Sequence, residues 1–175
     1  DIIKIDGVLS LQAKGNGFLS TLMTECDEKQ NLRGIVQWQE DQPVPETISL
    51  KDQLEGGYLV ITIAPRNGQT YQGIVEVTGD TLAESLEQYF FQSEQLPSRI
   101  WLAANGVQCG GLFLQRLPEE QAKEGDEDAW TRLTHLASTV SEEELVGLET
   151  EELLHRLYHE EEVRSYDTQT THFGG

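Results

Sequence analysis

The stretch LHRLYHEEEV, residues 154–163, carries the side chains best suited to chemistry, with two histidines followed at once by three glutamates. His155 and His159 are four residues apart, so on a helix both imidazoles lie on one face. Two imidazoles could bind one metal ion, but a catalytic zinc normally needs a third protein ligand. The metalloprotease pattern HExxH also fails, because Arg156 follows His155.

The alternative for this stretch is the charged end of an amphipathic helix. Its leucines would face inward and its glutamate run would be solvated. We favour this interpretation and predict no metal site among the residues of this chain. The inward-facing leucines would be Leu153, Leu154 and Leu157.

The two cysteines, Cys26 and Cys109, lie far apart in apolar-patterned segments, and the sequence contains no CxxC. We predict two reduced, half-buried thiols. The nucleophile pattern Gly-x-Ser-x-Gly is also absent. With no catalytic constellation visible, we expect that the protein is not an enzyme.

Two glycine pairs have structural explanations. The string GNGFL, with Gly15 and Gly17, lacks the third glycine and the helix of a dinucleotide loop, so it predicts a tight hairpin. The string CGGLF, residues 109–113, predicts a bulge or a close backbone approach inside a strand.

The charge of the chain excludes several classes of partner. Thirty-one acidic and twelve basic residues give a formal charge of −19, and sixteen of the acids but only four of the bases lie from Glu119 onward. Such a field repels phosphate backbones and anionic membrane surfaces, so we expect neither nucleic acid nor membrane as a partner. No membrane-length apolar run and no signal peptide are visible, which predicts a cytoplasmic protein.

Residues 1–118 read as a sheet-rich core domain. The clearest hairpin joins two β-rich runs through Pro65-Arg66-Asn67-Gly68, and a short helical turn ends at Gly56-Gly57. A helix opens with the capping-box pair Thr81 and Glu84, and two more strands flank Gly106. The fold class is therefore predicted as α+β, a mixed sheet with a packed helix.

After Pro118 the composition becomes polar and acidic, which predicts a domain boundary and an acidic arm over 119–173. Three short helices are expected at 128–138, 141–147 and 150–160, the second capped by Ser141 and Glu144. Helices this short are not stable alone, so each must pack on something, which we expect to be the sheet domain. The side chains for this packing are Leu133, Leu136, Leu145, Leu148, Leu153, Leu154 and Leu157.

Two strings carry a resemblance to a known family. GYLVITIAPRNGQTYQGIVEVTGDTLAESLEQYFFQSEQLPSRIWL combines a YQG hairpin strand, a GDT-capped helix and a YFxxSEQLP exit; RLYHEEEV is followed by YD. From Asp1 to about Phe173 the chain resembles the 33 kDa redox-regulated chaperones, bacterial heat-shock holdases also called 33 kDa chaperonins.

The resemblance implies an ATP-independent holdase that binds unfolding client proteins under oxidative and heat stress. It also implies a homodimer with arm exchange between subunits. In the reduced, zinc-bound state the linker would cover the client-binding surface; oxidation would release zinc and unfold the linker. The residues assigned to this regulatory linker are Leu145, Leu153, Leu157, Tyr158 and His159. The residues that touch clients are not assigned.

The family pattern continues with Cys-x-Cys and then Cys-x-x-Cys, where this chain reads HFGG. We therefore expect a fragment without the zinc module and without a leading segment, with residues 174–175 as a non-native tail. Zinc is implied for the full-length family, and no cofactor is expected in this fragment. The alternative function is a protein-docking module that binds one partner through the acidic arm.

Overall fold

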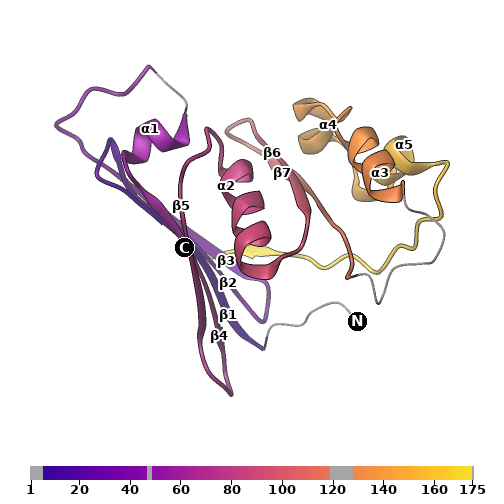
Figure 1. Cartoon of the computed structure of the whole chain (residues 1–175), viewed down its shortest axis with the longest axis horizontal. Helices are drawn as coiled ribbons and strands as arrows, with labels where there is room; N and C mark the ends of the chain where they lie inside the picture. The colour runs from indigo at the N-terminus through magenta and orange to yellow at the C-terminus, as the bar shows by residue number, and fades with distance from the viewer. Residues whose placement is uncertain (1–5, 47–48, 119–127, 175) are drawn as a thin grey trace. The chain divides into compact units, whose positions relative to one another are not determined.

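The computed structural model describes residues 6–46, 49–118 and 128–174. These residues form two compact units: residues 1–89 with 168–175 make unit 1, and residues 90–167 make unit 2. Both units combine strands with helices (Figure 1), which confirms the α+β class. The predicted boundary stretch after Pro118 falls largely on residues 119–127, outside the described residues.

Unit 1 is built on a six-stranded sheet with the strand order β5-β4-β1-β2-β3-β8. All neighbouring strands are antiparallel except β3 and β8, which are parallel, so the sheet is mixed as predicted. The strands are β1 Gly7–Lys14, β2 Leu19–Asp27, β3 Asn31–Trp38, β4 Tyr58–Pro65, β5 Tyr71–Glu76 and β8 His172–Phe173.

The turns of unit 1 follow the local sequence signals. Strands β4 and β5 pair through the turn after Pro65, which confirms the predicted hairpin. Helix α1, Leu50–Leu54, ends where Glu55 and Gly56 adopt positive φ, as the predicted helical turn requires. Helix α2, Leu82–Tyr89, begins with the predicted capping box, because the Glu84 N–H donates to Thr81 Oγ1 at 3.2 Å and Thr81 N–H donates back to Glu84 Oε2 at 3.2 Å.

Most of the core of unit 1 lies on one face of the sheet, although Val60 on the other face is also buried. Paired positions on neighbouring strands share a face, and Ala13, Leu59 and Val75 form one such row, which is buried. Tyr89 of α2 is 2% exposed and lies directly over Gly73, where a Cβ atom would overlap its ring. Glycine at this position therefore lets α2 pack against β5.

The connection between β1 and β2 is short, as GNGFL predicts, and the structure adds a reason for its glycines. The N–H groups of Asn16 and Gly17 donate to the carbonyl of Leu54 at 2.7 and 3.1 Å. A Cβ atom at Gly15 or Gly17 would collide with the backbone of α1. These glycines therefore seat the end of α1 on the β1–β2 turn.

Unit 2 contains a two-stranded antiparallel hairpin and three short helices. The helices confirm the three predicted ones, with bounds that differ by at most two residues. A five-residue π-helix precedes the hairpin. The elements are η1 Phe90–Glu94, β6 Ser98–Ala104, β7 Cys109–Gln115, α3 Ala129–Ala137, α4 Glu142–Gly147 and α5 Thr150–Tyr158.

The grouping of the hairpin differs from the sequence-based division at residue 118. Strands β6 and β7 form their own sheet and fall in one unit with the helices. The reason is packing: the leucines of the helices bury apolar side chains of this hairpin. In the described ranges no helix is long and apolar enough to cross a membrane.

Candidate functional site

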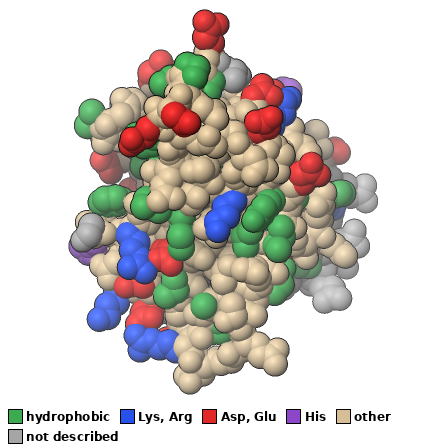
Figure 2. Space-filling view, turned by 90° about the vertical axis from the view of Figure 1, so that its left-hand side faces the viewer, with side chains coloured by type: hydrophobic (Ala, Val, Ile, Leu, Met, Phe, Trp, Pro, Cys, Tyr) green, Lys and Arg blue, Asp and Glu red, His purple; other side chains and the backbone are tan. Residues whose placement is uncertain are grey.

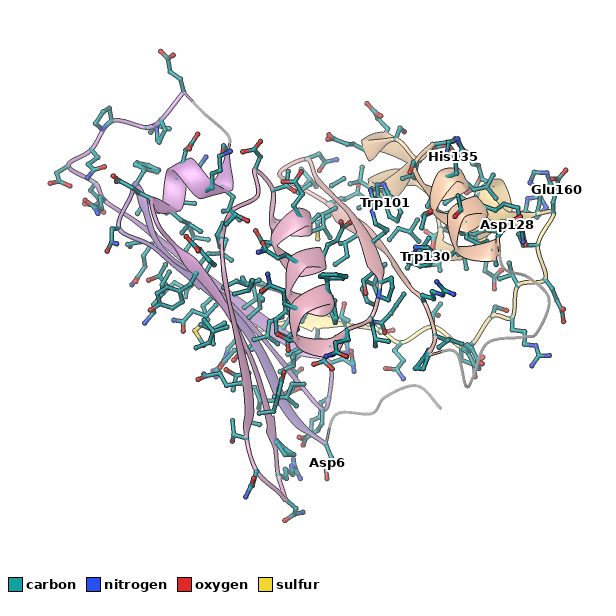
Figure 3. The ribbon with its side chains drawn as sticks, viewed as in Figure 1. Asp6, Trp101, Asp128, Trp130, His135 and Glu160 are labelled. Carbon is teal, nitrogen blue, oxygen red and sulfur yellow. The ribbon has the colours of Figure 1, made fainter. Side chains whose placement is uncertain are left out.

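The three helices of unit 2 pack on one face of the β6–β7 hairpin. Strand residues that face them alternate with residues that do not, as the pleat requires. Figure 3 shows Trp101 of β6 and Trp130 of α3 in this region. The buried members of the cluster are Ala137, Leu145, Leu153, Leu157 and Tyr158; partly buried members include Trp101, Ala103, Leu112, Leu114, Leu133, Leu136, Leu148 and Leu154.

Gly110 allows the closest contact between the hairpin and the helices. A Cβ atom at this position would overlap the main-chain carbonyl of Leu145 on α4. The backbones of β7 and α4 therefore touch with no side chain between them, as CGGLF predicted.

A capping box starts α4, as the sequence predicted. Ser141 Oγ accepts from the Glu144 N–H at 3.1 Å, and the Ser141 N–H donates to Glu144 Oε2 at 2.8 Å. This donation by the Ser141 backbone, followed by the Arg156 guanidinium, holds the pKa of Glu144 below its ordinary value. The capping box of α4 therefore also favours the charged form of the Glu144 carboxylate.

Arg156 of α5 ties α5 to the start of α4. Its Nε donates to Glu144 Oε1 at 2.7 Å, while Nη1 and Nη2 donate to the side-chain and main-chain oxygens of Thr139 at 2.7 and 3.1 Å. One side chain therefore joins α5, the α3–α4 connection and the cap of α4.

A second set of contacts joins α3 to the end of α5. Arg132 binds Glu161 through two parallel hydrogen bonds, Nε to Oε1 at 2.6 Å and Nη2 to Oε2 at 3.2 Å. The Tyr158 hydroxyl donates to the Leu133 carbonyl at 3.4 Å, and burial raises the pKa of this hydroxyl. We call α3, α4 and α5 with the connections between them, residues 129–158, the helical arm.

The structure brings together four of the five residues assigned to the regulatory linker. Leu145, Leu153, Leu157 and Tyr158 all belong to the buried cluster. His159 does not, because it is exposed at the end of α5. A regulatory role for these five residues stays a prediction.

His155 and His159 are arranged like neighbouring side chains on the surface of a helix, and not like the ligands of a metal ion. The rings of His155 and His159 have centroids 5.8 Å apart, and both residues are exposed. Within residues 6–46, 49–118 and 128–174, no group of three His, Cys, Asp or Glu side chains could hold a metal ion. These residues therefore do not fit a zinc site.

The cysteines differ from the expectation in one respect. Cys26 is half-buried on β2, as predicted, but Cys109 is exposed at the start of β7. Its side chain lies on the face of the hairpin that the helices leave free, paired with Ala104. The apolar residues around it in the sequence occupy both faces of the strand, so the apolar run did not indicate burial.

Large apolar side chains lie exposed in both units. On the face of the β6–β7 hairpin that points away from the arm, Leu102 is 46% exposed and Phe113 is 48% exposed, while Ile100 on the same face is buried. Phe113 contacts Phe90, with ring centroids 5.1 Å apart. Figure 2 shows one side of the molecule, with hydrophobic side chains in separate patches between charged ones.

On the sheet of unit 1, the face opposite Ala13, Leu59 and Val75 carries a mostly apolar row across the strands, with the polar Gln12 at its centre and Val60 buried beside it. The paired positions of this row run through Ile74, Val60, Gln12, Met23 and Ile35. The row ends exposed on both sides, with Ile74 61% and Ile35 52% accessible. Only the register shows that the apolar members of this row line up.

Three features of the arm were missed by reasoning from the sequence. Ala137 is completely buried, but an alanine gives no pattern that separates it from an exposed one. The links from Arg156 to Glu144 and from Arg132 to Glu161 span twelve and twenty-nine residues. No local pattern reports contacts at that separation.

Comparisons with known proteins point to one family. The family model described as Hsp33 protein matches residues 1–174. A 33 kDa chaperonin of Pseudomonas fluorescens is 44% identical over 173 residues, which are 98% of this chain and 57% of the relative. A 33 kDa chaperonin of Ectopseudomonas mendocina is 46% identical over 173 residues, 98% of this chain and 58% of the relative. The chain thus spans a little over half the length of these relatives.

A solved structure supports the fold. The crystal structure of a 33 kDa chaperonin from Thermotoga maritima matches with a TM-score of 0.72 at 18% identity, over 96% of this chain and 60% of that one. At this identity the match concerns the fold alone, whereas the family model and the bacterial relatives concern the sequence. Together they place the chain in a family: it belongs to the Hsp33 protein family.

Proposed function

We propose that this chain is the client-binding part of a molecular chaperone that holds unfolding proteins without ATP and without enzymatic chemistry. One observation carries the proposal: the β6–β7 hairpin is apolar on both faces, the helical arm covers one of them, and Leu102 and Phe113 on the other are about half exposed although Ile100 beside them is buried. Relatives named 33 kDa chaperonin support the same function. Clients would be unfolded or misfolded proteins.

The packing of the arm supports a masking role. Trp101, Ala103, Leu112 and Leu114 face the arm and would become accessible if the arm detached. They would then add to Leu102 and Phe113, which are exposed already. The arm consists of three short helices that depend on this contact, so its local unfolding costs less than global unfolding. We propose that release of the arm enlarges the client-binding surface.

Regulation, cofactor and location are part of the proposal for the whole protein. Family membership supports control by oxidation and a zinc-holding cysteine module, but the described residues here do not form such a site. The charge of −19 supports a protein without nucleic-acid or membrane partners and keeps complexes with apolar clients in solution. A homodimer and a cytoplasmic location are proposed with the support of family membership alone.

The test is light scattering of a thermally aggregating client, measured with increasing amounts of this chain. We expect suppression of scattering at near-stoichiometric ratios for several unrelated clients, with ovalbumin at equal mass as the control. Suppression no better than that of ovalbumin would overturn the proposal.

A docking module is the second candidate, and the outer surface of the arm favours it. Glu142, Glu143, Glu151, Glu152 and Glu160 are all exposed there. Such a surface would suit one basic partner protein. The two functions separate in the same experiment, because a docking module would not protect unrelated clients.

A further inference from the structure

Helix α2 continues without a break into the π-helix η1, and the boundary between the two units falls at the same peptide. The chain is α-helical up to Tyr89, and η1 begins at Phe90. Unit 1 likewise extends to Tyr89, and unit 2 begins with Phe90. Turns of the π type are rare, are often found at functional sites, and are among the few places where helices bend sharply. The change of helix type therefore lies where one unit gives way to the other.

Two neighbouring aromatic rings fasten this junction to different units. The Tyr89 side chain is almost fully buried and lies over Gly73 of β5, which belongs to unit 1. The Phe90 ring contacts Phe113 of β7, which belongs to unit 2, with ring centroids 5.1 Å apart. Helix α2 is thus held by the sheet of unit 1, and η1 is held by the β6–β7 hairpin. Any rotation between the units must be absorbed close to the backbone between these two rings.

The far end of η1 is fixed within unit 2. The Leu96 N–H donates to the Phe90 carbonyl at 3.3 Å, and the Arg116 N–H donates to the Pro97 carbonyl at 2.9 Å. Between them Gln95 has a φ of 55°, a left-handed conformation that residues other than glycine adopt at a cost. Such a conformation persists where the surrounding structure enforces it. A bend between the units is therefore confined to the start of η1.

The second connection between the units does not hold them in one orientation. Residues 162–171, all within the described chain, form neither helix nor strand, and every one of them is exposed. The boundary between the units lies inside this stretch, between Asp167 and Thr168. Ten extended residues span up to about 33–36 Å. This connection limits how far the units can separate, and it leaves their orientation to the α2–η1 junction.

We propose that the α2–η1 junction, residues 89–94, is a hinge about which unit 2 turns relative to unit 1. Hinges are commonly a few residues at the ends of elements, which absorb a change in φ and ψ while the segments on either side keep their packing. Tyr89 over Gly73 and Phe90 against Phe113 are the packed contacts on the two sides.

The use of this hinge rests on the proposed holdase function. Both units carry exposed apolar side chains, Ile35 and Ile74 on the sheet of unit 1, and Leu102 and Phe113 on the hairpin of unit 2. A hinge lets the two surfaces take up apolar segments that lie at different spacings along an unfolded client. The clients that fit are therefore flexible polypeptides with at least two apolar segments and no fixed distance between them.

The first test measures distances between spin labels by pulsed electron paramagnetic resonance, in a chain that carries Cys26→Ser and Cys109→Ser. Labels at the exposed Lys29→Cys of unit 1 and Val107→Cys of unit 2 report across the hinge. Lys29→Cys with the exposed Asn67→Cys is the control pair within unit 1. An excess of unlabelled chain removes distances between copies. We expect a distribution about twofold wider across the hinge than within unit 1, because hinge motions displace whole units. Equal widths would overturn the hinge.

Two variants locate the motion. Phe90→Ala removes the ring that fastens η1 to Phe113, so it should widen the distribution across the hinge further. Phe91→Ala is the matched control, because this neighbouring ring of the same π-helix is 69% exposed. It should leave the distribution unchanged. Equal effects of the two variants would overturn the assignment of the hinge to residues 89–94.

Amide hydrogen exchange on the unaltered chain decides the matter even if Phe90→Ala fails to fold. Segments that open locally exchange faster than the elements that stay packed. The amides of residues 91–94 should therefore exchange about tenfold faster than those of residues 86–89, in the last turn of α2. Equal protection on both sides of Tyr89 would mean that α2 and η1 move as one rigid helix, which overturns the hinge.

The hinge and the holdase function fail separately. A wide distribution and rapid exchange in η1, without aggregation suppression, keep the hinge and remove the function. Aggregation suppression by a chain with a narrow distribution removes the hinge and leaves the function.

Discussion

Arg156 on α5 holds the carboxylate of Glu144, with Nε 2.7 Å from Oε1, and the same carboxylate closes the capping box of α4. One acidic side chain therefore fixes both the start of one helix and its attachment to the next. The contacts of this pair lie twelve residues apart in the sequence, within the helical arm. Lowering the pH, or substituting a residue of this pair, should therefore weaken the helical arm.

Low pH should weaken the helical arm through Glu144. The pKa of Glu144 is lowered from 4.5 in the folded state, so its stabilising contribution is full above 4.5 and disappears as the pH falls through the lowered value. Glu144→Gln should keep a cap acceptor but lose this pH dependence. Thermal unfolding of the helices between pH 7 and pH 3 measures it, and Glu143→Gln, at an exposed site in the same turn, is the control. Equal pH dependence in all three proteins would contradict the prediction.

Gly110→Ala should detach or displace α4. The new methyl group would overlap the Leu145 carbonyl, and overpacking of this kind costs about 1–3 kcal/mol. Gly147→Ala is the matched control, because a Cβ atom there meets nothing within 4 Å. Hydrogen exchange in the arm should accelerate only in Gly110→Ala. Similar exchange in both variants would mean that the close contact does not hold α4 in place.

Loosening the arm should raise aggregation suppression. Leu153→Ala or Leu157→Ala removes a buried side chain, at a cost of about 2–5 kcal/mol, while the sheet of unit 1 keeps its own core. Client scattering and thermal unfolding are measured together, with the exposed His155→Ala as the control. Unchanged or reduced suppression with an intact sheet would count against masking by the arm, and a loss of binding would favour the docking module.

Oxidant should not switch this chain reversibly. The exposed Cys109 should react with iodoacetamide before the half-buried Cys26, since access limits thiol reactions. The sequence has no CxxC, so neither cysteine has a resolving thiol close to it in the sequence. Peroxide should leave aggregation suppression within about twofold. A larger change that reductant reverses, and that Cys109→Ser removes, would reveal a sensor at this position.

Zinc should bind this chain only weakly. His155 and His159 offer two ligands on an exposed face, and tetrahedral zinc needs more. Calorimetric titration should show no stoichiometric site at micromolar zinc, and His159→Ala should change the titration little. One zinc retained per chain after dialysis would refute this.

Local signals predicted much of the fold. Both capping boxes, the β4–β5 turn and the three arm helices depend on residues within one or two turns of each other, and all were readable. The inward leucines of α5 were readable too, because helical periodicity places them on one face.

Contacts between distant segments were not readable. The sequence indicated a close approach at Gly110 but could not name Leu145 as the partner. It indicated strands at β6 and β7 but not that they would join the helices instead of the larger sheet. The pairing of β8 with β3 left no trace at all, because a two-residue strand held by its main chain needs no particular side chains.

The return of the chain to unit 1 at residues 168–175 has a mechanical consequence. Unit 2 is inserted between two segments of unit 1, so both of its ends are connected to unit 1. Tension applied at residue 174 reaches β8 first, and the main-chain hydrogen bonds that pair β8 with β3, among them those from His172 and Gly174, must break before force is transmitted to the arm. Force applied at this end would therefore first break the short pairing of β8 with β3 and only then reach α5. A cut inside unit 2 would leave both resulting fragments attached to the sheet of unit 1.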